Sequence, residues 1–178
     1  MYLRDKLLYE IDILNKSNNL NQYKYYTRDM IALLEKYSWN AEMLYIIARK
    51  LNNVDIEYLQ QLLLNTGSAK YLYLFALEGY KGINYNLITE VICNTQDIEY
   101  MFKTAKYISK ANYKQVIQTL VSMKRFDVIK LLEVRNPIVK RKRIINKMVK
   151  LYTKDVKFTS LKPQFDIDKR DCIFDKIL

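Results

Sequence analysis

The sequence contains no histidine and only two cysteines among its 178 residues. Without histidine, the chain lacks the most frequent general base and the most frequent metal ligand of proteins. Cys93 and Cys172 are far apart and form no CxxC motif, so they indicate neither a zinc site nor a redox pair. Cys93 lies in an apolar stretch, and we expect it to be a small buried side chain. This usage predicts a reducing, intracellular setting, with a single disulfide as the alternative.

Glycine, proline and long apolar runs are also scarce. The chain has three glycines and two prolines, whereas sheet-rich folds need more frequent turns. No stretch approaches the ~18 continuous apolar residues that span a bilayer. The N-terminal segment mixes both charge signs, unlike a secretion signal. Because half of the residues are apolar, the composition predicts a packed core. Together with the scarcity of glycine, proline and long apolar runs, it predicts an intracellular, helical protein with no membrane partner.

A repeat is present in the middle of the chain. Ala48, Ala76 and Ala105 are 28 and 29 residues apart, and each has an aromatic residue three positions earlier. A fixed period of this length is typical of stacked repeat arrays. Short polar residues suited to capping helix starts recur within it at Asn40, Asp55, Ser68, Asn84, Asp97 and Asn112. Each repeat is therefore predicted to hold two short helices, with the alanine allowing a close helix contact.

The repeat predicts an all-α fold, a right-handed α-solenoid of about ten short helices in antiparallel pairs. We expect one helical-repeat domain over residues 1–157, clearest over 40–134, with two helices before the repeats. A helix over 125–134 and a last one over 137–153 follow, and a C-terminal tail, 158–178, packs on the last helices. Such arrays build extended surfaces rather than enclosed pockets, which favours binding over catalysis.

The second repeat carries a resemblance to known proteins. It reads AKYLYLFAL, EGYKGIN and YNLITEVI in succession. This pattern resembles the α-solenoid repeats of the TPR and HEAT class, and more closely the short two-helix repeats of uncharacterised phage and giant-virus proteins. It lacks the Trp-Leu-Gly-Tyr pattern of a TPR, and its period is shorter than the 34 residues of that repeat. The resemblance, over about residues 40–134, implies a phage- or virus-encoded interaction scaffold and transfers no catalytic residue.

Positive charge is concentrated near the C-terminus. The net charge is +11, and residues 135–157 hold nine Lys or Arg against one Asp. On a helix over 137–153, most of these cations form one stripe opposite an apolar face. The candidate partner- or phosphate-binding residues are Lys140, Arg141, Arg143, Lys147, Lys150 and Lys154. A solvated face, phosphate contacts to nucleic acid and an acidic patch, on a partner or on the chain's own tail, are the three interpretations left open.

No catalytic motif stands out. The chain has no Gly-rich phosphate loop and no GxSxG elbow. The tail carboxylates Asp171 and Asp175 have basic neighbours and predict surface ion pairs. Some DNA glycosylases with HEAT-like repeats use a Trp and an Asp at the lesion, but the single tryptophan, Trp39, is better interpreted as a core residue at a helix junction.

The sequence thus predicts a non-enzymatic interaction protein with no cofactor, no metal and no small-molecule substrate. Its repeat surface and basic edge would dock on an acidic protein or ribonucleoprotein complex, as an inhibitor or as a scaffold. The alternative function is nucleic-acid binding, with the basic helix 137–153 contacting phosphates. The oligomeric state stays open, because solenoid ends without a polar cap favour dimers.

Overall fold

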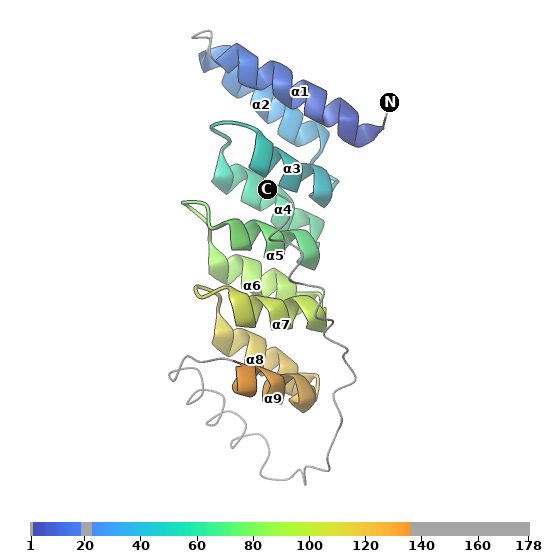
Figure 1. Cartoon of the computed structure of the whole chain (residues 1–178), viewed down its shortest axis with the longest axis vertical. Helices are drawn as coiled ribbons and strands as arrows, with labels where there is room; N and C mark the ends of the chain where they lie inside the picture. The colour runs from blue at the N-terminus through green and yellow to red at the C-terminus, as the bar shows by residue number, and fades with distance from the viewer. Residues whose placement is uncertain (1, 19–22, 136–178) are drawn as a thin grey trace. The chain divides into compact units, whose positions relative to one another are not determined.

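The computed structural model describes residues 2–18 and 23–135 (Figure 1). Over these residues the chain forms nine α-helices and no strand, which confirms the all-helical prediction. The helices are α1 (Leu3–Asn18), α2 (Tyr23–Lys36), α3 (Ala41–Lys50), α4 (Ile56–Thr66), α5 (Ala69–Glu78), α6 (Tyr85–Asn94), α7 (Ile98–Tyr107), α8 (Tyr113–Ser122) and α9 (Phe126–Arg135). None of them combines the length and the hydropathy that crossing a membrane requires.

The chain divides into two compact units, residues 1–119 and residues 120–178. The first unit holds α1 to α7 and most of α8. In the second unit, the described residues form the end of α8 and α9. The predicted basic helix 137–153 and the predicted tail 158–178 lie outside the described residues.

Polar caps fix the starts of the repeat helices at the predicted positions. Asn40 Oδ1 accepts the Met43 N–H at 3.1 Å, and Asp55 Oδ1 accepts the Tyr58 N–H at 3.0 Å. Asn84, Asp97 and Asn112 cap α6, α7 and α8 in the same way. Ser68 stands at the N-cap of α5 but makes no side-chain cap bond. Because a cap satisfies a backbone N–H that has no partner within the helix, these residues set the helix boundaries.

Within the first unit, the helices after α2 contact their neighbours in a repeating scheme. The helices α3, α5 and α7, called here the A helices, follow one another, since α3 contacts α5 and α5 contacts α7. The helices α4, α6 and α8 are called the B helices, and α4 contacts α6. Each of α3 and α5 also packs on the B helix that follows it (Figure 1). The helix α1 contacts α2 and α3.

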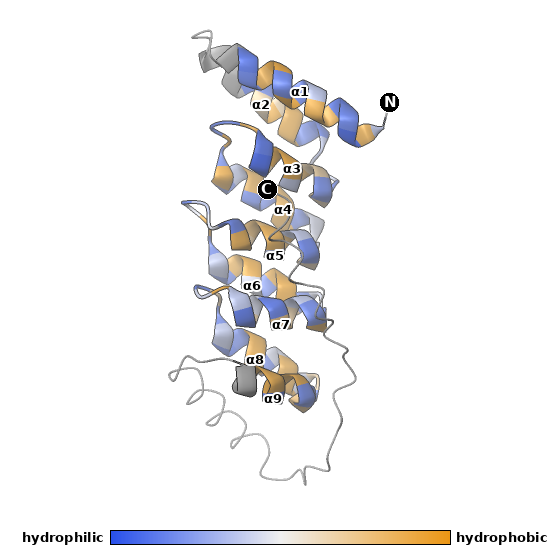
Figure 2. Ribbon diagram, viewed as in Figure 1, coloured by the Kyte–Doolittle hydropathy of each residue, from blue (hydrophilic) through white to orange (hydrophobic). Residues whose placement is uncertain are grey.

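The core of the first unit is built from equivalent positions of the A helices. Ala48, Ala76 and Ala105 are all buried, each eight residues after the cap of its helix. A small side chain at this position is compatible with the contacts that α5 makes with α3 and α7. Figure 2 shows hydrophobic and hydrophilic residues alternating along the helical ribbons, as expected for helices with one buried face. The Cys93 side chain is also buried, at 3% exposure, which confirms that prediction.

The prediction for Trp39 is wrong. Its side chain is 68% exposed, in the turn between α2 and α3. Tyr37, two residues earlier, is buried instead and donates a hydrogen bond to Glu10 of α1. Since Trp39 directly precedes the N-cap Asn40, the chain at this point has left one helix and has not entered the next. The aromatic residue that plugs the junction is therefore the one at the end of α2.

In the second unit, α9 begins with an ion pair. The Arg125 guanidinium donates two hydrogen bonds to the Asp127 carboxylate, at 3.0 and 2.6 Å. This pairing holds the pKa of Asp127 below its ordinary value. Val128, Ile129 and Leu132 form the buried face of α9.

Candidate binding surface and groove

The sequence-predicted binding residues cannot be placed in the fold. They all lie outside the described residues: Lys140, Arg141, Arg143, Lys147, Lys150 and Lys154. Asp171 and Asp175 lie outside them as well. The candidate site described below is therefore built from the first unit, on residues that the sequence interpretation did not select.

The B helices are joined by a repeated hydrogen bond. Gln60 of α4 and Thr89 of α6 are both buried, and each stands five residues after the cap of its helix. The Gln60 Oε1 accepts the Asn84 N–H at 2.8 Å, and the Thr89 Oγ1 accepts the Asn112 N–H at 3.2 Å. In each case the donor is the N-cap of the following B helix. These bonds satisfy buried polar groups and set the spacing from one repeat to the next.

Four tyrosines connect the A helices, and we call them the tyrosine row: Tyr45, Tyr71, Tyr73 and Tyr100. The rings of Tyr45 and Tyr71 have centroids 6.0 Å apart, and those of Tyr73 and Tyr100 are 5.9 Å apart. Each pair bridges two consecutive A helices. Tilted aromatic pairs at this spacing stabilise a fold by more than the burial of their apolar area alone would.

Cations lie against the rings of the tyrosine row on each A helix. The Arg49 guanidinium is 5.9 Å from the Tyr45 ring centroid, and the Lys70 ammonium is 5.2 Å from that of Tyr71. The Lys103 ammonium is 5.4 Å from that of Tyr100 and also pairs with Glu99. Arg49 and Lys70 are exposed, so the row presents positive charge beside aromatic faces to the outside.

Tyr45 and Tyr71 each interact with a carboxylate from the neighbouring A helix. The Tyr45 hydroxyl donates to Glu78 Oε1 at 2.7 Å, and Arg49 Nε lies 3.2 Å from the same oxygen. Burial, followed by the hydrogen bond to Glu78, raises the pKa of Tyr45. Burial also raises the pKa of Tyr71, with the Glu42 carboxylate adding to the effect. Both hydroxyls therefore stay protonated and act as donors at neutral pH.

A tyrosine closes the space between the ends of α3 and α5. Tyr80 follows α5, and its hydroxyl donates to the Ala48 carbonyl of α3 at 3.1 Å. Its ring lies against Phe75, with centroids 5.4 Å apart. Burial raises the pKa of Tyr80, and the nearby Glu78 carboxylate raises it further. One side chain thus fills the gap and caps a carbonyl near the end of the neighbouring helix.

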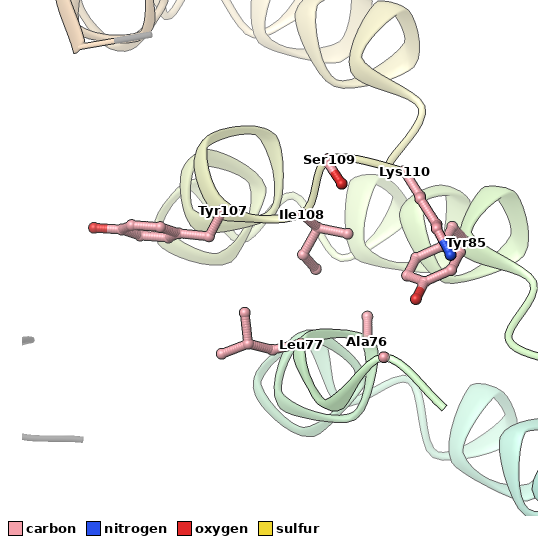
Figure 3. A pocket seen from close by; sticks show the side chains of 8 residues that line it. Ala76, Leu77, Tyr85, Tyr107, Ile108, Ser109 and Lys110 are labelled. Carbon is pink, nitrogen blue, oxygen red and sulfur yellow. The ribbon is translucent and has the colours of Figure 1, made fainter. Parts of the chain in front are cut away.

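The corresponding space between α5 and α7 is open. A groove with a volume of about 240 Å³ lies there. It is lined by Ala76, Leu77, Gly79, Tyr85, Tyr107, Ile108, Ser109 and Lys110. Figure 3 shows Ile108 pointing across the gap toward Ala76 and Leu77, with Tyr107 at one end.

The groove has aromatic ends and a polar side. At the end opposite Tyr107, the Lys110 ammonium is 5.4 Å from the Tyr85 ring centroid (Figure 3). Leu77 and Tyr107 are about half exposed, at 52% and 49%. These two residues are among the large hydrophobic side chains that the first unit leaves exposed, and here they are the walls of one groove. Such a lining suits a flat, mainly apolar group with a polar tip.

The residues that sequence reasoning missed leave a signal in the repeat alignment. Tyr80 and Ser109 occupy the same position, twelve residues after the caps Ser68 and Asp97. When the two repeats are aligned, the large Tyr80 stands at the same position as the small Ser109. This difference in size marks the position where the α3–α5 interface is filled and the α5–α7 interface is not. In the residues that the structure describes, no group of three or more cysteine, aspartate or glutamate side chains is arranged to bind a metal ion.

Comparison of the chain with protein-family models, with curated proteins and with solved structures gives no match.

Proposed function

We propose that this protein is a non-enzymatic interaction protein, built as a right-handed α-solenoid of antiparallel helix pairs. Its A-helix surface and its basic C-terminal segment dock together on an acidic macromolecular partner, a protein or a ribonucleoprotein complex. The observation that carries the proposal is the tyrosine row, because it runs over three consecutive A helices and displays cations beside aromatic rings. A phage- or virus-encoded origin stays a prediction from the resemblance.

The solenoid proposal is supported by contacts that recur from repeat to repeat. The A helices contact one another in order, and so do α4 and α6. Gln60 and Thr89 make the same buried hydrogen bond at the same position of successive repeats. Stacked repeats of this kind have interfaces mainly with their neighbours and produce long, continuous surfaces.

The surface proposal is supported by its composition. Tyrosine and arginine are enriched at protein interfaces and dominate their binding energy, because both combine a large contact area with polar groups. The tyrosine row offers aromatic faces together with the exposed side chains of Arg49 and Lys70. The groove between α5 and α7 adds the exposed Leu77 and Tyr107 on two of the same helices.

The choice of an acidic partner is supported by the charge distribution. Residues 1–134 hold 17 Lys or Arg against 14 Asp or Glu, and some of these cations pair locally, as in Lys36–Glu10 and Arg49–Glu78. The larger excess of positive charge belongs to residues 135–157, with nine basic residues and one acidic residue. Such a segment raises the association rate with an oppositely charged surface and makes it dependent on salt.

Affinity capture with the full chain tests the proposal. Three chains serve as bait: the natural chain, the variant Lys140→Glu/Arg143→Glu/Lys147→Glu, and the variant Arg49→Ala/Lys70→Ala. We expect one acidic partner to bind the natural chain, to bind each variant at least ten-fold more weakly, and to dissociate as salt rises. A matched control, Lys162→Glu/Lys169→Glu/Lys176→Glu, makes the same charge change in the neutral segment 158–178 and should bind normally.

Fluorescence polarisation with duplex and single-stranded oligonucleotides separates the nucleic-acid alternative. If five basic residues contact phosphates, log K against log salt should have a slope of about −4 to −5 for duplex DNA. Nanomolar binding with that slope, lost in the Lys140/Arg143/Lys147 variant and retained in the control, would replace the protein partner with nucleic acid. A partner that binds the Arg49/Lys70 variant normally would show that the A-helix surface is not the docking surface.

A further inference from the structure

We propose that the groove between α5 and α7 binds a tyrosine side chain of the partner polypeptide, with its hydroxyl donating to the Ala76 carbonyl. This inference rests on the proposed interaction function and names one anchor of the partner. It follows from comparing the groove with the preceding repeat, where this chain supplies a tyrosine of its own.

The two interfaces differ at several equivalent positions: Glu78 corresponds to Tyr107, Gly79 corresponds to Ile108, and two aromatic residues of the first correspond to small residues of the second. Tyr80 in the first corresponds to Ser109 in the second, twelve residues after the cap. Phe75, on which the Tyr80 ring packs, corresponds to Thr104. Two aromatic rings are therefore replaced by two small hydroxyl side chains. Thr104 is fully buried and does not line the groove, and its Oγ1 is without a hydrogen-bond partner in the described structure.

The size of the groove matches one aromatic ring. An engineered cavity of about 150 Å³ in another protein binds benzene. The groove here is about 240 Å³, which leaves room for a phenol ring and its β-carbon. Since the groove is open to the outside, a side chain can enter it while its backbone stays on the surface.

The hydrogen-bond acceptor is the counterpart of one already in use. In the first interface, the Ala48 carbonyl accepts the Tyr80 hydroxyl at 3.1 Å. Ala76 is the equivalent residue of the next repeat, and it lines the groove. A carbonyl oxygen has two lone pairs, so a residue near a helix end can accept a second donor from a ligand. Carbonyls at a helix C-terminus also carry partial negative charge, which favours a hydroxyl donor.

The walls of the groove favour an aromatic guest. Leu77 and Ile108 supply apolar contacts, and Tyr85 and Tyr107 stand at its two ends. Aromatic rings prefer tilted or offset contacts with other rings, of the kind seen between Phe75 and Tyr80. Because tyrosine is enriched in protein interfaces, a tyrosine of the partner is an occupant consistent with the proposed function.

Nuclear magnetic resonance titration of the ¹⁵N-labelled full chain tests the proposal, with N-acetyl-tyrosinamide as the probe up to ~10 mM. We expect chemical-shift changes concentrated at residues 76–79 and 107–110. N-acetyl-phenylalaninamide, which lacks the hydroxyl, should bind about five-fold more weakly, because one neutral hydrogen bond is lost. The peptide Ala-Ala-Tyr-Ala-Ala should bind at least as well as the single residue; a groove that admits the amide but excludes the peptide overturns a polypeptide partner.

Three variants locate the binding. Ser109→Tyr fills the groove from within and should abolish the shifts, whereas Ser109→Ala leaves it open and should retain them. Tyr107→Ala removes an exposed wall with little risk to folding and should weaken binding at least three-fold. Equal affinity for the phenylalanine probe, shifts at other residues or no effect of Tyr107→Ala overturns the proposal. A partner captured normally by a chain that ignores all probes rejects the groove and leaves the interaction function intact.

Discussion

The α3–α5 contact and the α5–α7 contact use corresponding helix positions with different side chains. In the first, the Tyr80 hydroxyl reaches Ala48, and Glu78 receives both Tyr45 and Arg49. In the second, Ser109 takes the place of Tyr80, Tyr107 takes the place of Glu78, and a groove remains. The B helices on the other side make the same bond in both repeats.

The difference shows that one set of residues recurs between the repeats, whereas another set decides whether an interface is closed or open. The Gln60 and Thr89 bonds and the buried alanines recur, so they set the spacing of the repeats. The helix ends vary, with Glu78, Gly79 and Tyr80 in one repeat against Tyr107, Ile108 and Ser109 in the next, so closure or opening of an interface depends on the side chains there. An interface between two repeats can therefore be filled or left open by its side chains, because neighbouring repeats already hold the walls in position.

Opening the first interface at Tyr80 should have the largest effect. In Tyr80→Ser, a half-buried ring and its hydrogen bond to Ala48 are lost. We expect the free energy of unfolding to fall by about 2 kcal/mol, less than the cost of removing a fully buried aromatic residue. Urea denaturation measures the change.

The same variant should gain a property of the second interface. If the open space forms as it does between α5 and α7, N-acetyl-tyrosinamide should stabilise Tyr80→Ser more than it stabilises the natural chain. The exposed Tyr9→Ser is the matched control and should change neither quantity by more than about 0.5 kcal/mol. A loss below 0.5 kcal/mol in Tyr80→Ser itself would mean that Tyr80 does not close the interface.

The bond shared by both repeats gives the next effect. Gln60→Leu removes the acceptor of the Asn84 N–H in a buried setting. Leaving that donor without a partner should cost about 1–2 kcal/mol, measured by urea denaturation. The neighbouring Gln61→Leu is the control, since Gln61 is exposed and bonds only to Asn65 of its own helix among the described contacts. If the two variants lose equal stability, the bond between α4 and α6 does not hold the repeats together.

The helices, their caps and the buried alanines were predictable from sequence because their causes are local. A cap such as Asn40 acts on an N–H three residues away, and amphipathic spacing repeats within one helix. The predicted helix boundaries of the repeats therefore agree with the structure to within a few residues.

The groove was not predictable, because its cause is not local. Whether Tyr80 reaches Ala48, 32 residues earlier, depends on how two helices pack. The loop that carries Tyr80 runs over residues 79–84, and the loop that carries Ser109 is one residue shorter, over 108–112, so even their alignment needs the helix bounds. The prediction that Trp39 is buried was wrong for a related reason, since its burial depends on where α2 ends and not on its hydrophobicity. The basic residues from Lys140 to Lys154 stay a prediction.

The smallest expected effect concerns the hydrogen bond that links the tyrosine row to Glu78. Tyr45→Phe removes a 2.7 Å bond to a partly exposed carboxylate, so the loss at neutral pH should be about 0.5 kcal/mol. Because the pKa of Tyr45 is raised in the folded chain, its contribution is complete below the ordinary tyrosine pKa of about 10. Above that pH the unfolded chain ionises first, and the natural chain loses stability relative to Tyr45→Phe. Urea denaturation at neutral pH and above pH ~10 should therefore show that the natural chain loses its advantage in free energy of unfolding over Tyr45→Phe as the pH rises. If the natural chain instead became increasingly more stable than Tyr45→Phe as the pH rises, Tyr45 would be ionised in the folded state and could not donate to Glu78.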